Sequence, residues 1–274
     1  MISDFLKQKP ISCYFGFAFL ISWATAFLII TPELINGQSV QKEDGLFMFP
    51  AMIIGIGFTG IVLTLATDDK QGFQSLLRKM RNWQVKARWY LAAFFIPPVT
   101  IILVLNILSR WVSPDFSIHP FFIGILFGIP TGFFEEIGWM GYVFPKLQQK
   151  YSNFISGLLL GLAWGFWHLP VIDFLGAASP HGSYWSLYFL SFISVMSAMR
   201  VLIVWVYVNT NSVLVCQFMH ASSTGFLVML SPSPIAPLKE AYWYFAYAIA
   251  LWSLVLVIIL FNGKTMRLTS SPKI

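Results

Sequence analysis

The sequence predicts an all-α fold: a polytopic bundle of about eight transmembrane helices that forms one integral membrane domain over residues 1–274. Two properties of the chain support this fold class. Apolar residues make up 57% of the 274 positions and charged residues only 10%, and the mean hydropathy is +0.73. Apolar runs of about 20 residues, each long enough to cross roughly 30 Å of hydrocarbon as a helix, also recur along the chain. This composition is typical of a membrane protein and excludes an ordinary soluble domain.

Eight apolar runs define the predicted spans. They are residues 11–31, 47–67, 89–109, 120–145, 154–175, 185–208, 212–230 and 241–261. The first run follows a short basic start, as in a signal peptide, but its length and bulky aromatic residues favour a retained membrane anchor. No internal repeat, low-complexity tract or linker divides the chain, so a single domain is expected.

Lysine and arginine gather on one side when the eight spans are threaded alternately through a bilayer. Thirteen fall on one side (Lys7, Lys9, Lys70, Arg78, Lys79, Arg81, Lys86, Arg88, Lys146, Lys150, Lys264, Arg267 and Lys273) and three on the other (Lys42, Arg110 and Lys239). Because cytoplasmic loops are enriched in these residues, both termini are predicted to be cytoplasmic, in a protein of a bacterial plasma membrane. Topology thus explains the net charge of +6 without a nucleic-acid partner.

The one long hydrophilic connection, residues 68–88, is basic and contains apolar residues between its charges. We interpret it as a charged cytoplasmic loop beside membrane lipid. The alternative is a short amphipathic helix that lies on the anionic inner leaflet.

Five ionisable side chains remain at membrane depth: Glu135 and Glu136 in the fourth run, His168 in the fifth, Arg200 in the sixth and His220 in the seventh. Such groups cost several kcal/mol in lipid, so they face the bundle interior and one another. Adjacent residues on a helix point about 100° apart. One glutamate can therefore face a cavity while the other contacts a neighbouring helix, which predicts an intramembrane site.

These residue types are sufficient for amide hydrolysis by an activated water. A carboxylate in a low-dielectric cavity can take a proton from water, one imidazole can hold that water, and a second can donate to an oxyanion. His168 alone could equally be a structural residue bonded to a backbone carbonyl, and Arg200 a structural counter-ion. We expect His119 and His181 to be solvated in outward loops and Asp173 to be hydrated near a span end.

Three short motifs lie in order over about residues 120–230. Glu135-Glu136-Ile-Gly-Trp-Met140 continues as Gly-Tyr-Val-Phe-Pro-Lys-Leu-Gln, Trp164 precedes His168 by four residues, and Thr224 follows His220 by four. The set resembles the CPBP family, whose motifs are Glu-Glu-x-x-x-Arg, an aromatic residue four before a His, and a His four before an Asn. This family includes type II CAAX prenyl endopeptidases and bacterial proteins linked to bacteriocin processing or immunity.

The resemblance implies an eight-helix intramembrane glutamic endopeptidase that needs no metal or other cofactor. Glu135 would activate water with His168, Glu136 would be the second acid of the site, and His220 and Thr224 would line the oxyanion site. The substrate would be a hydrophobic or lipidated peptide or protein, of CAAX type or another membrane-associated kind, cleaved near the cytoplasmic face.

Two positions depart from the family pattern: Met140 stands where the motif has Arg, and Thr224 where it has Asn. A thioether cannot pair with a carboxylate, so Glu136 loses the partner one turn along its helix. We predict that Arg200 supplies this charge from the sixth run. Thr224 keeps a hydroxyl donor at the same spacing.

Other functions remain as alternatives. The two departures favour a catalytically weak or silent family member that acts as a membrane binding or immunity scaffold. A proton-coupled transporter would use similar residues, but no repeated pair of broken helices is evident. A zinc protease is disfavoured because HExxH is absent, and serine and aspartic intramembrane proteases because GxSG and GxGD are absent. Cys13 and Cys216 are expected to be buried thiols.

Overall fold

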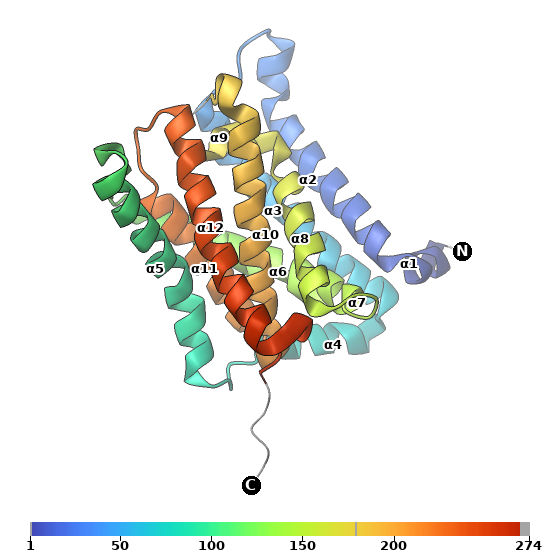
Figure 1. Ribbon diagram of the computed structural model, residues 1–274. Helices are drawn as coiled ribbons and strands as arrows, with labels where there is room; N and C mark the ends of the chain where they lie inside the picture. The colour runs from blue at the N-terminus through green and yellow to red at the C-terminus, as the bar shows by residue number, and fades with distance from the viewer. Residues whose placement is uncertain (1, 179, 269–274) are drawn as a thin grey trace.

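Long helices make up the described part of the molecule, residues 2–178 and 180–268 of a computed structural model (Figure 1). These ranges contain no strand, so the all-α prediction is confirmed. Six of their helices are long and apolar enough to span a membrane. These are α2 (Pro10–Ile35), α3 (Lys42–Thr67), α5 (Ala87–Trp111), α10 (Trp185–Thr210), α11 (Val213–Leu230) and α12 (Pro237–Asn262).

The fourth and fifth predicted runs are not continuous α-helices. The fourth is divided into a 3-10 turn (Phe122–Gly124), α6 (Ile125–Gly138), a π turn (Trp139–Val143) and α7 (Phe144–Leu147). The fifth bends by 40° where α8 (Asn153–Trp167) meets the segment Leu169–Leu175, which contains α9 (Ile172–Leu175). Pro170 explains this bend, since proline lacks an N–H and clashes with the preceding turn.

The count of about eight spans is therefore approximate: the described residues have six, or up to seven with the bent pair taken as one. The chain also has two short helices, α1 (Ile2–Gln8) and α4 (Asp69–Met80). Helix α4 occupies part of the basic connection, where an amphipathic helix was the alternative to a loop. It buries Leu76 and exposes Lys70 and Arg78.

One end of the bundle, which we call the basic end, contains α4, the 81–86 loop, the α7–α8 loop and the α10–α11 turn. Lys146 pairs with Asp68 at 2.8 Å. The Asn82 amide donates to the carbonyl oxygen of Thr210, and its backbone carbonyl accepts from the Ser212 hydroxyl at 2.6 Å. Loops that were predicted on one side of the membrane thus lie together; Lys273, also predicted there, lies outside the described residues.

The opposite end contains the 36–41, 112–121 and 231–236 connections and the segment around α9 (Figure 1). Lys239 pairs with Asp115. The backbone N–H of Phe121 donates to the carbonyl oxygen of Met229 at 2.8 Å. These contacts join the 112–121 connection to the end of α11 and the start of α12.

Glycines allow α6 and α11 to approach closely. A Cβ atom at Gly128 would lie 2.0 Å from the carbonyl oxygen of Ala221, and one at Gly132 would lie 2.5 Å from that of Gln217. Small residues four apart are a common way to pack helices in membranes, where van der Waals contact replaces the hydrophobic effect. This packing places Glu136, one turn after Gly132, beside His220.

Candidate active site

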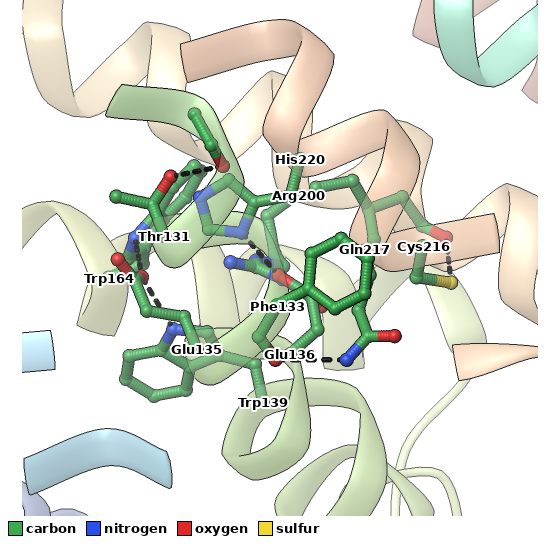
Figure 2. Close-up of polar contacts among 12 residues, drawn as sticks. Thr131, Phe133, Glu135, Glu136, Trp139, Trp164, Arg200, Cys216, Gln217 and His220 are labelled. Atoms are coloured by element: carbon green, nitrogen blue, oxygen red, sulfur yellow. Dashed lines mark hydrogen bonds and ion pairs between the residues drawn. The ribbon is translucent and has the colours of Figure 1, made fainter. Parts of the chain in front are cut away.

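The sequence-predicted residues converge in the middle of the bundle. Glu135 and Glu136 lie on α6, Arg200 on α10 and His220 on α11 (Figure 2), while His168 follows the last residue of α8. Each of the five residues is at most 4% exposed. Charged and polar groups buried to this degree require partners. Glu136, Arg200 and His220 bond to one another, whereas the partners of Glu135 and His168 are tryptophans.

Glu136 is held by two cationic or polar groups. Its Oε1 accepts from Arg200 Nη1 at 2.6 Å and from His220 Nδ1 at 2.6 Å (Figure 2). The predicted contact with Arg200 is present, whereas the contact with His220 was not predicted. The Arg200 guanidinium also lies 4.4 Å from the ring centroid of Trp164, a cation–π contact that compensates part of its desolvation.

Glu135 points to different partners, as the 100° rotation between neighbours requires. Its Oε2 accepts from the indole Nε1 of Trp164 at 2.8 Å and from that of Trp139 at 3.1 Å (Figure 2). Its Oε1 has no hydrogen-bond donor among the described residues. One carboxylate oxygen is thus fixed by two neutral donors, and the other is left to act on a ligand.

The orientation of His168 follows from the end of α8. Its backbone N–H bonds to the carbonyl of Gly165 and so leaves the carbonyl of Trp164 to accept from His168 Nδ1 at 2.7 Å. Because a carbonyl can only accept, Nδ1 bears the proton, and Nε2 is the free lone pair of the neutral ring. His220 Nδ1 likewise donates to the Glu136 carboxylate.

One cavity of about 610 Å³ joins most of these groups. Glu135, His168, His220 and Thr224 line it, while Glu136 does not. Most of the remaining wall is aromatic or aliphatic. Four of the five residues predicted to form the site therefore line one cavity. The fifth, Glu136, does not line it but accepts a hydrogen bond from His220.

A second polar cluster at the opposite end was missed by the sequence reasoning. Glu240, which is 1% exposed, accepts from the backbone N–H groups of Ala177 and Ala178, each at 2.7 Å. His181 Nε2 lies 3.1 Å from Glu240 Oε2, and its Nδ1 lies 2.7 Å from Asp173 Oδ1. The prediction that His181 is solvated is wrong: it is 1% exposed, because it packs between these carboxylates. Asp173 itself is half-buried.

His181 makes the stability of this cluster depend on pH. Burial disfavours its charged form, but hydrogen bonds to Glu240 and Asp173 outweigh burial and raise the pKa of the imidazole above its ordinary value of 6.5. Stabilisation by protonated His181 is then fully present below about pH 6.5 and is lost as the pH rises through the raised pKa.

We therefore expect wild type to melt at a higher temperature than His181→Gln at acidic pH, with the difference shrinking as the pH rises. Thermal unfolding in detergent across this pH range measures it. His119→Gln, at an exposed histidine of the same end, is the matched control and should show no such trend. A wild-type advantage that grows with pH would contradict the assignment.

Comparison with known proteins matches the same part of the chain. Residues 117–226 match the family model described as type II CAAX prenyl endopeptidase Rce1-like. The CAAX prenyl protease 2 of Methanococcus maripaludis is 25% identical over 253 residues, which cover 86% of this chain and 88% of that protein. With the apolar helical bundle, these matches define an integral membrane peptidase. Over residues 117–226 the chain is similar to the Rce1-like family, in agreement with the resemblance of its motifs.

Proposed function

We propose that the chain is an intramembrane glutamic endopeptidase in which Glu135 and His168 activate water. The observation that supports this most directly is that both residues line one cavity and each keeps an unengaged atom, Oε1 and Nε2. Water held between them gives a proton to Glu135 while its oxygen attacks the peptide carbonyl carbon. The proton then passes from Glu135 to the leaving amine nitrogen as the C–N bond breaks.

His220 and Thr224 would stabilise the tetrahedral oxyanion. They lie one turn apart on α11 and line the same cavity as Glu135. Thr224 donates through its hydroxyl. In this scheme the His220 ring carries a proton on both nitrogens: Nδ1 donates to Glu136 and Nε2 donates to the oxyanion. Glu136 and Arg200 are positioning residues in this scheme.

The substrate in this proposal is a hydrophobic or lipidated peptide. Phe49, Phe127 and Phe192 contribute to the cavity wall, which suits apolar side chains or a lipid chain. The name of the archaeal relative, CAAX prenyl protease 2, makes a prenylated C-terminal peptide the first substrate to test.

The test compares wild type with Glu135→Gln in detergent on prenylated peptides and on a library of membrane peptides. We expect cleavage to fall by about 10²–10⁴-fold, the usual contribution of a general base, and chelator to have no effect on wild type. Asp69→Asn, an exposed acid-to-amide change at the basic end, is the matched control and should retain activity. Equal cleavage by Glu135→Gln and wild type, or loss of wild-type activity with chelator, would contradict this mechanism.

The scaffold alternative makes a different prediction in the same assay: a folded wild type that cleaves nothing. The sequence supports this alternative because Met140 and Thr224 stand where the family motifs have Arg and Asn. The contact between Arg200 and Glu136 removes the first of these two arguments, because the second glutamate has a counter-charge without an arginine at 140.

A further inference from the structure

The last turn of α8 needs hydrogen-bond donors from outside the helix. The carbonyl groups that end an α-helix have no N–H partner within it. Beyond α8, Pro170 has no N–H to offer. The N–H of His168 turns back to the carbonyl of Gly165 at 3.2 Å, and the N–H of Val171 bonds to the carbonyl of His168 at 2.9 Å. The carbonyls of Trp164 and Trp167 are therefore left for other groups.

Two side chains supply these donors. His168 Nδ1 donates to the carbonyl oxygen of Trp164 at 2.7 Å. The indole Nε1 of Trp23, on α2, donates to the carbonyl oxygen of Trp167 at 3.0 Å. Trp167 is inaccessible to solvent, so water cannot replace this donor, and an unpaired carbonyl there would be costly. Trp23 thus closes the end of α8 from another helix, at the residue next to His168.

The hydrogen bond from Trp23 bears directly on the orientation of His168. The Trp167 carbonyl and the His168 backbone nitrogen belong to one planar peptide group, so a donor that fixes the carbonyl also fixes the direction in which the His168 side chain leaves the backbone. Ring contacts surround the imidazole, with centroid distances of 5.9 Å to Phe49 and 5.2 Å to Phe192. These contacts fill space, whereas the hydrogen bonds decide which ring nitrogen faces the cavity.

The same side of α2 also contacts the tryptophan that holds Glu135. Aromatic residues four apart form a row along this helix: the ring centroids of Trp23 and Phe19 lie 5.5 Å apart, and those of Phe19 and Phe15 lie 6.3 Å apart. The Phe15 ring then lies 6.3 Å from Trp139, whose indole donates to Glu135. Helix α2 thus packs behind both members of the proposed catalytic pair.

We propose that Trp23 is a positioning residue of the peptidase: its indole N–H holds the peptide group between Trp167 and His168 and so keeps His168 Nε2 directed into the cavity. Helix α2 lies outside residues 117–226, the segment that matches the family model. The catalytic geometry therefore depends on a helix that carries none of the three motifs. This role rests on the proposed peptidase function for its effect on rate, whereas the order that Trp23 gives to the end of α8 does not.

Hydrogen exchange tests the structural part of this role without a substrate. Trp23→Phe removes the indole donor and keeps an aromatic ring, and replacement of Trp23 by benzothienylalanine keeps the shape of indole and removes only the N–H. We expect both variants to speed exchange of the His168 and Val171 amides by about threefold or more. Trp205→Phe is the matched control, because Trp205 is also half-buried and its Nε1 has no acceptor among the described residues. Unchanged exchange in both Trp23 variants would overturn the proposal.

The kinetics of cleavage test the functional part. With prenylated peptides in detergent, we expect both Trp23 variants to lower kcat by about threefold to tenfold, the effect of one neutral hydrogen bond. KM should change little, because Trp23 does not line the cavity. An equal loss of kcat in Trp205→Phe, or an unchanged kcat despite faster exchange in the Trp23 variants, would overturn the proposal. Absence of cleavage by wild type would instead contradict the peptidase function, with the exchange rates still deciding whether Trp23 orders the end of α8.

Discussion

Arg200→Met is expected to destabilise the protein by about 3–5 kcal/mol, the usual cost of removing one partner from a buried ion pair. Glu136 is fully buried and its Oε1 is bound by Arg200, while its Oε2 has no hydrogen-bond donor among the described residues. Without the guanidinium, the carboxylate keeps only His220. Unfolding by denaturing detergent in mixed micelles measures the change, and Arg110→Met, at an exposed arginine, should leave stability nearly unchanged.

The pairing itself is tested by a double-mutant cycle. Glu136→Gln removes the charge from the other side, so Arg200→Met combined with Glu136→Gln should cost much less than the sum of the two single changes. Strict additivity of the free energies of unfolding would contradict the pairing. A further variant, Met140→Arg with Arg200→Met, returns the charge to the family position. It should recover part of the lost stability, because residue 140 lies one turn from Glu136.

The pairing of Arg200 with Glu136 could be predicted because a membrane leaves few choices. The chain has one cation at membrane depth and two acids, and a buried charge requires a partner. The residues of the three motifs could likewise be placed in one site, since their spans are long and apolar. Hydropathy and charge pairing are properties of composition and of short segments, which a sequence displays directly.

The details that were missed depend on contacts between distant segments. The bend at His168 leaves both halves apolar, so hydropathy does not reveal it, although Pro170 is a local signal. The contact of His220 with Glu136 depends on how α6 and α11 are rotated. The buried position of Glu240 could not be predicted, because its partners Ala177 and Ala178 precede it by more than 60 residues.

Trp164→Phe is expected to lower kcat by about tenfold to 100-fold while the fold remains intact. Phenylalanine keeps an aromatic ring beside His220, whose centroid lies 4.8 Å away, and beside Arg200. It also keeps the backbone carbonyl that orients His168. Only the hydrogen bond from the indole N–H to Glu135 Oε2 is lost. A hydrogen bond to a charged group is worth about 1.5–3 kcal/mol, and 1.36 kcal/mol in the barrier changes a rate tenfold.

The split between kcat and KM separates positioning of the base from general packing. Trp164 holds one oxygen of Glu135, so its loss frees the carboxylate to rotate away from the water and lowers kcat, while substrate contacts and KM change little. Trp252→Phe is the matched control, because it removes an indole hydrogen bond to Ser194 at 3.0 Å without lining the cavity. An unchanged kcat in Trp164→Phe, or an equal loss in Trp252→Phe, would show that the indole N–H does not position Glu135. Trp139→Phe removes the longer bond of 3.1 Å and should reduce kcat less, since the shorter bond remains to hold the carboxylate.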